Sequence, residues 1–111
     1  MDYPPKQIEM AIIKKKMNLS DSEFKLPTKT NPQPSGRYAR DIADVLRIID
    51  GLRRQPDLSY IPSLRDTIGF VQDLREGDDF FTAFDRNIKN MYYGEEADRV
   101  EEALNAVHRR S

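Results

Sequence analysis

The feature that most constrains this chain is a run of apolar residues at helical spacing between Arg37 and Arg54. Five of them follow the spacing i, i+3, i+4, i+7 and i+10: Ile42, Val45, Leu46, Ile49 and Leu52. This spacing places all five on one face of an α-helix, and arginines and aspartates occupy most of the other positions. Pro56 ends the pattern, because proline cannot continue a helix. The stripe must be buried against other elements, so we expect this helix to be central to the fold.

A shorter helix is predicted at the N-terminal end, from about Pro5 to Met17. Proline suits a first helical turn, and Asp2 just ahead would interact favourably with the helix dipole. Three lysines occupy its last turn, where the dipole favours cations: Lys14, Lys15 and Lys16. The residues predicted to share its apolar face are Ile8, Ala11 and Ile12.

A third helix is predicted after a short extended piece, residues 58–61. Ser63 and Asp66 resemble a capping box at its start, and Gly77 suits its C-terminal end. Its predicted buried stripe is Leu64, Ile68, Val71 and Leu74.

Two more helices complete the pattern. Asp78 or Asp79 is expected to cap the fourth, and Glu95 and Glu96 to open the fifth, with residues 109–110 at its basic end. Their predicted faces are Phe80, Phe81, Phe84 and Ile88, and then Ala97, Val100, Ala103, Leu104 and Val107. The sequence therefore predicts one all-α domain over residues 1–111, a bundle of four to five helices.

Residues 18–36 interrupt the helical patterns. This segment contains Pro27, Pro32, Pro34 and Gly36 among serine, threonine and asparagine, a composition typical of linkers. We expect a long, mobile, Pro-rich loop after the first helix. Phe24 and Leu26 are the apolar residues expected to tether it to the core.

Charge and residue usage exclude several classes of function. The formal net charge is −1, so no overall basic field exists to hold nucleic acid or an anionic membrane. The charge is nevertheless uneven: residues 1–34 are lysine-rich, and residues 76–111 are mildly acidic. The absence of cysteine excludes thiolate metal sites and fits a reducing compartment, and His108 is the only histidine. We expect a cytoplasmic protein, without a signal peptide or membrane span.

The remaining candidate motifs each have a structural alternative. The chain has neither a phosphate-binding glycine loop nor a credible Ser-His-Asp arrangement. The acid pairs at 78–79 and 95–96 are better explained as helix caps than as acid–base pairs. The aromatic cluster could stack on single-stranded nucleic acid, although its acidic neighbours favour core packing: Phe80, Phe81, Phe84, Tyr92 and Tyr93. The three lysines could meet a phosphate backbone or could simply be a solvated helix end.

Arg65 is the one residue for which the sequence leaves a functional interpretation open. It lies in the first predicted turn of the third helix, just after Pro62 and Ser63. A side chain there can project beyond the helix end towards an anion on a neighbouring domain, and a guanidinium is suited to phosphate. The alternative is a surface arginine paired with Asp66 or with an acid on another helix.

Four segments carry a resemblance to a known family: residues 2–5 with the helix that follows, the helix 42–52, residues 61–65, and residues 84–88 with the final acidic helix. Together they resemble the C-terminal helical lid of AAA+ ATPases of the MoxR type, in particular the CbbQ/NorQ-like branch. The segment Ile61-Pro62-Ser63-Leu64-Arg65 is similar to the one that places the family's sensor-2 arginine at a helix start. The Pro-rich stretch 27–34 departs from the family pattern.

This resemblance implies a lid that is not an enzyme alone. ATP and magnesium would be held by a core domain outside this chain, and Arg65 would approach the phosphates and act with that core in catalysis. The implied partners are the core, neighbouring subunits of a homo-oligomeric ring and possible von Willebrand A-domain proteins, in chaperone-like remodelling. The chain itself would bind no metal or cofactor. Two alternatives remain: a helical protein-interaction module unrelated to ATPases, and a helix-turn-helix DNA binder using residues 61–74, against which the acidic balance argues.

Overall fold

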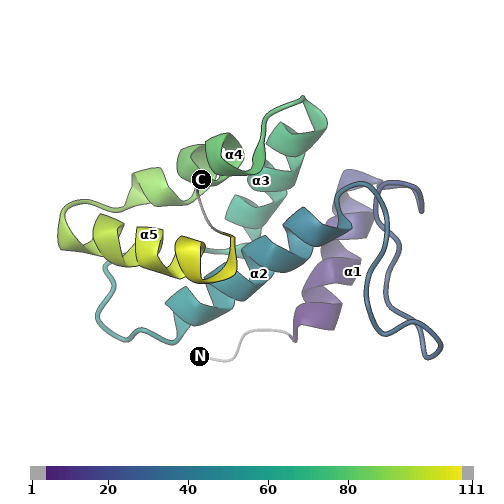
Figure 1. Cartoon of the computed structure of the whole chain (residues 1–111), viewed down its shortest axis with the longest axis horizontal. Coiled ribbons are helices and arrows are strands. Elements are labelled where there is room, and N and C mark those ends of the chain that lie inside the picture. Colours follow the sequence, from purple (N-terminus) through teal and green to yellow (C-terminus); the bar gives the residue numbers. More distant parts are fainter. Residues whose placement is uncertain (1–4, 109–111) are drawn as a thin grey trace.

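The computed structural model describes residues 5–108 as five α-helices packed around one core (Figure 1). The helices are α1 (Lys6–Met17), α2 (Ala39–Arg53), α3 (Leu64–Arg75), α4 (Phe80–Asn87) and α5 (Glu95–Val107), with a short 3-10 turn η1 (Lys89–Met91) after α4. The predicted all-α class is confirmed. The predicted roles of Asp2 and of Arg109 and Arg110 lie outside the described residues.

Helix α2 is the central element, as its apolar stripe predicts. All five residues of that stripe are buried, and Ile48, on another face, is also only 1% exposed. The helix packs against both α5 and α3, which explains why more than one of its faces is covered. Helix α2 lies between α1 and α5 (Figure 1).

Helix α1 turns a different face to the core from the predicted one. Ile8 and Ala11 are exposed and Ile12 is half-buried, whereas Met10 and Ile13 are buried. The prediction of this face was wrong because α1 carries two competing apolar stripes and is only weakly amphipathic. Contacts with α3, rather than local pattern, decide which stripe is covered.

The turn between α3 and α4 has the predicted chemistry. Gly77 has a positive φ of 106°, and the backbone N–H groups of Gly77 and Asp78 bond to the carbonyls of Leu74 and Asp73 at 3.1 and 3.0 Å, a Schellman motif. Asp79, not Asp78, caps α4 by accepting from the Thr82 N–H at 2.9 Å.

Two predicted stripes need small corrections. Leu64 and Ile68 are only half-buried and Phe70 takes the core position, while Phe81 is half-buried beside Phe80 and Phe84.

Thr67 occupies a core position that the apolar pattern does not reveal. Its side chain is fully buried, and its Oγ1 makes no hydrogen bond with any described residue. A buried hydroxyl without a partner costs roughly 1–3 kcal/mol. We therefore expect Thr67→Val, which keeps the shape, to raise the free energy of unfolding by about 1 kcal/mol in urea denaturation. The matched control is Thr82→Val at an exposed position, which should change the free energy of unfolding by less than about 0.5 kcal/mol. A destabilised Thr67→Val variant would show that the Thr67 hydroxyl has a partner.

The segment 18–36 is anchored more firmly than its composition suggests. Phe24 is completely buried and Leu19, which the sequence interpretation passed over, is 5% exposed, whereas Leu26 is only half-buried. An isolated antiparallel bridge between Lys25 and Ser35 closes the base of the loop, so that residues 26–34 form its outer part. Gly36 permits this closure, because a Cβ there would lie 2.7 Å from the Glu23 carbonyl oxygen. The mobility of the outer part remains a prediction.

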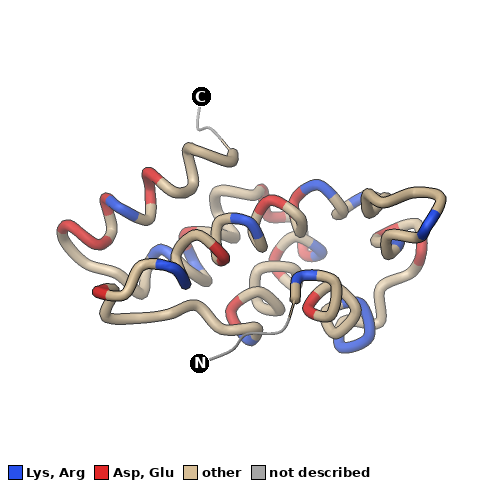
Figure 2. The backbone as a smooth tube through the Cα atoms, turned by 90° about the horizontal axis from the view of Figure 1, so that it is seen from below, with Lys and Arg blue, Asp and Glu red and all other residues tan. Residues whose placement is uncertain are grey.

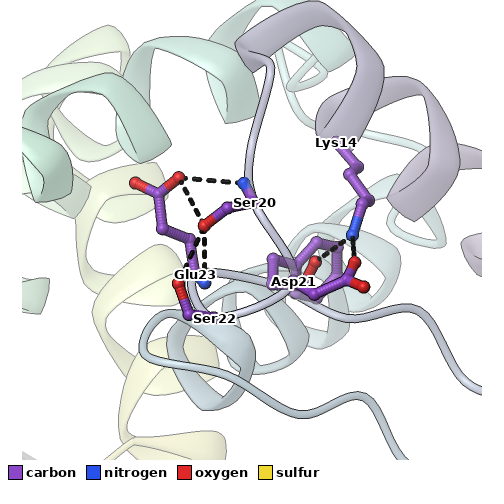
Figure 3. A network of polar contacts seen from close by, with 6 residues as sticks. Lys14, Ser20, Asp21, Ser22 and Glu23 are labelled. Atoms are coloured by element: carbon purple, nitrogen blue, oxygen red, sulfur yellow. Dashed lines mark hydrogen bonds and ion pairs between the residues drawn. The ribbon is translucent and has the colours of Figure 1, made fainter.

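Polar contacts secure the first turn of this loop (Figure 3). The Glu23 carboxylate accepts from the Ser20 N–H at 3.0 Å, and the Glu23 N–H donates to the Ser20 hydroxyl at 3.3 Å. The Lys14 ammonium reaches Asp21 at 2.5 Å and the Phe24 carbonyl at 2.6 Å. Lys14 is therefore a structural residue that joins α1 to the loop, rather than part of a solvated lysine run.

Candidate functional site

The candidate site is built at the first turn of α3. Pro62 and Ser63 bring the chain to the helix start in an extended conformation, and Ser63 and Asp66 form the predicted capping box. The Asp66 carboxylate accepts from the Ser63 N–H at 2.9 Å. The cap holds the first turn in place, and with it the backbone of Arg65.

The Asp66 carboxylate accepts hydrogen bonds from Tyr60 and Ser63, the Ser63 hydroxyl included at 3.4 Å, and does not pair with Arg65. Besides the Ser63 N–H, its carboxylate accepts from the Tyr60 hydroxyl at 2.5 Å. This hydrogen bond, with burial and the negative charge of Asp66, raises the pKa of Tyr60 to about 12. Tyr60 in turn packs edge-on against Tyr92, whose hydroxyl donates to the Tyr60 carbonyl at 2.8 Å. Asp66, next to Arg65 in the sequence, is thus held in place by hydrogen bonds from Tyr60 and Ser63.

Arg65 is exposed and makes no hydrogen bond or ion pair with any residue of the described part of the chain. It borders an open hollow of about 690 Å³ between the start of α3, α4 and η1. Among the residues that line this hollow, Arg65 is the only cation and Asp66 the only acid. The geometry can offer one free guanidinium to an anion, but it provides no second cation and no phosphate-binding loop.

A close contact between α3 and α4 forms one wall of the hollow. Gly69 allows this approach, because a Cβ there would lie 2.5 Å from the Asn87 side-chain oxygen. The Asn87 amide donates to Asp73 and to the Ala83 carbonyl, each at 2.8 Å. Sequence reasoning missed Gly69 and Asn87. A glycine inside a predicted helix was the available signal, since such a residue often marks a close approach.

The acidic pairs have structural roles. Asp79 caps α4, and Asp78 pairs with Arg86 at 2.7 Å, which raises the pKa of the Arg86 guanidinium. Glu96 does more than open α5: its carboxylate accepts from the Ser59 hydroxyl at 2.7 Å and from the Ser59 N–H at 3.1 Å. These contacts leave neither pair available as an acid–base dyad.

The aromatic cluster is divided between core and surface. Phe80, Phe84 and Tyr92 are buried, as the core-packing interpretation predicts, whereas Tyr93 is 84% exposed. His108 extends the cluster, because its ring stacks on Phe80 with centroids 4.1 Å apart and its Nδ1 lies 2.9 Å from Asp44. The single histidine is therefore part of the packing between α4 and the C-terminal end of α5.

A largely buried ion pair was not predicted from the sequence. Glu9 of α1 pairs with Arg53 of α2 at 2.5 Å, with the two side chains only 3% and 9% exposed. The Arg53 guanidinium also donates to the Pro62 carbonyl at 3.2 Å, one residue before the cap of α3. This pair links α1 and α2 to the segment that carries Arg65. A lone acid in a lysine-rich helix was the only trace of it in the sequence.

The described residues offer neither a metal-binding cluster nor a helix that could span a membrane. No group of three or more histidine, aspartate or glutamate residues between positions 5 and 108 is placed to hold a metal ion. None of the helices in this range has the length and apolar character needed to cross a bilayer.

Comparison with known proteins does not assign the chain to a family. No family model, curated protein or solved structure matches it.

Proposed function

We propose that this chain is the helical lid of a MoxR-type AAA+ ATPase, which closes over ATP held by a core domain outside it. The observation that carries the proposal is the state of Arg65. It is an exposed arginine that forms no hydrogen bond or ion pair with residues 5–108, and it is held at the start of a capped helix beside an open hollow. A guanidinium in this position can neutralise charge on a phosphate presented by another domain.

Two further features support the proposal. The alternative partner of Arg65, Asp66, is occupied by Ser63 and Tyr60, so the ion pair that would explain Arg65 structurally is not formed. Arg65 is also the only cation among the described residues that line the hollow, which suits a residue that completes a nucleotide site elsewhere rather than one that forms a site alone. In this proposal lid closure is coupled to remodelling of partner proteins by a ring of subunits.

The test is ATP turnover by this chain joined to its proposed core. Arg65→Ala should lower turnover roughly ten- to a thousand-fold, the range for loss of one charge-stabilising donor. Arg65→Lys should restore only part of it, because a point charge replaces a planar fork. The isolated chain should bind ATP more weakly than about 10 µM in a calorimetric titration.

The control for this test is another exposed arginine. Arg47 is exposed and, like Arg65, forms no hydrogen bond or ion pair within residues 5–108, so Arg47→Ala should leave turnover unchanged. Arg75, although on the same helix as Arg65, is unsuitable: it pairs with Glu23 at 3.2 Å and donates to the Met17 carbonyl at 2.8 Å. Turnover that is unchanged by Arg65→Ala while stability falls would contradict the proposal.

A second candidate function is a protein-interaction module unrelated to ATPases. It is favoured by three large apolar side chains on the surface: Ile8 at 51%, Met91 at 43% and Tyr93 at 84% exposure. ATPase activity of the protein that contains this chain distinguishes the two, because an interaction module requires none.

A further inference from the structure

Within the described residues, α1 and α5 each carry an exposed face with charged side chains that form no ion pair, and the two faces have opposite charge. On α1, Ile12, Lys15 and Lys16 follow Ile8 by four, seven and eight residues, which places all four within one face. Ile8, Lys15 and Lys16 are exposed, and Ile12 is half-buried. We call these four residues the basic face. The only acid of α1, Glu9, lies on the buried side and is paired with Arg53.

On α5, Glu95, Asp98 and Glu102 lie on one side of the helix, and all three are exposed. Tyr93, also exposed, comes just before the helix. We call these four residues the acidic face. Asp98 and Glu102, like Lys15 and Lys16, take part in no hydrogen bond or ion pair through their side chains within the described range.

The two faces lie on opposite sides of α2. Figure 1 shows α1 and α5 flanking that helix, towards the two ends of the long axis. In Figure 2 the C-terminal end of α1 is blue, and most of the charged positions of α5 are red. One molecule therefore cannot bring its own two faces together, but two molecules can.

We propose that the basic face of one molecule binds the acidic face of a second copy of this chain, in a head-to-tail contact. The basic face begins with Ile8 and Ile12 and ends with Lys15 and Lys16. The acidic face begins with Tyr93 and Glu95 and ends with Asp98 and Glu102. Parallel packing of α1 on α5 places Ile8 and Ile12 near Tyr93, and the two lysines near Asp98 and Glu102. This inference does not depend on the proposed nucleotide role of Arg65.

The geometry also determines the kind of assembly. Each copy keeps one basic and one acidic face free after a single contact, so association continues into a ring or an open filament. Two short helix faces bury less surface than the about 1,600 Å² of a standard interface, so the contact is weak. Because the charged residues remain near solvent, salt weakens it further.

The experiment is sedimentation velocity of the full 111-residue chain at low salt, at concentrations up to about 1 mM, where weak contacts become populated. The sedimentation coefficient of the wild type should rise with protein concentration. It should fall back in 0.5 M salt, because the Debye length shrinks from about 10 Å at 0.1 M towards about 3 Å at 1 M. Lys15→Glu with Lys16→Glu should abolish the rise, and so should Asp98→Lys with Glu102→Lys. Circular dichroism shows whether each variant is folded.

Mixing the two charge-swapped variants is the decisive arm. Each supplies the face that complements the other, so the equimolar mixture should regain concentration-dependent association while neither variant associates alone. Tyr93→Ser should weaken wild-type association without changing its charge. A wild type that stays monomeric throughout, or a mixture that does not associate, overturns the proposal. Lysine-dependent binding to phosphatidylserine vesicles by a chain that stays monomeric overturns it as well, in favour of a membrane surface.

Discussion

Replacing Glu9 with alanine should lower the free energy of unfolding by about 3–5 kcal/mol, the cost of leaving one partner of a buried ion pair uncompensated. The Glu9 carboxylate lies 2.5 Å from the Arg53 guanidinium, and the two side chains are 3% and 9% exposed. Removing the acid would leave the largely buried Arg53 guanidinium without its carboxylate partner, although the Pro62 carbonyl would still accept from it. Urea denaturation followed by circular dichroism measures the change.

The chain provides a matched control one residue away. Arg54 pairs with Asp50 at 3.1 Å, but its side chain is 78% exposed. Arg54→Ala should therefore cost less than about 0.5 kcal/mol. Replacing Glu9 and Arg53 together with methionine should cost less than Glu9→Ala, since no unpaired charge remains. A Glu9→Ala variant within about 1 kcal/mol of the wild type would show that water reaches Arg53.

Phe84→Ala should be about as damaging, at roughly 3–5 kcal/mol, as is usual when a buried aromatic side chain is truncated. Phe84 is 0% exposed and stacks on Phe80 with ring centroids 6.1 Å apart. Its loss would leave a cavity where α4 meets the core. The shift in the midpoint of denaturant unfolding, with the slope unchanged, measures the effect.

Tyr93→Ala is the control for this aromatic truncation. The tyrosine side chain is 84% exposed, so its removal should change the free energy of unfolding of the monomer by less than about 0.5 kcal/mol. Equal effects of the two substitutions would mean that the packing of α4 against the core is wrongly described.

The sequence predicted well wherever one element carries a single dominant pattern. The stripe of α2, the Schellman turn at Gly77 and the caps at Ser63 and Asp79 depend on residues within a few positions of each other. Local spacing and turn chemistry are enough to specify such features. The position of Arg65 in the first turn of α3 follows from the same local rules.

Tertiary structure alone decided the features that join distant residues. The buried face of α1 could not be chosen from its two apolar stripes, and the Glu9–Arg53 pair joins positions 44 residues apart. The contacts of Asp66, the acid that lines the hollow beside Arg65, likewise depend on Tyr60, whose hydroxyl donates to its carboxylate. Periodicity shows that a side chain will be buried or charged, but not which partner meets it, because the partner is brought there by the packing of other helices. The sequence by itself therefore determined the helices and their caps, and the packing of the helices determined which charges are paired and which are left exposed.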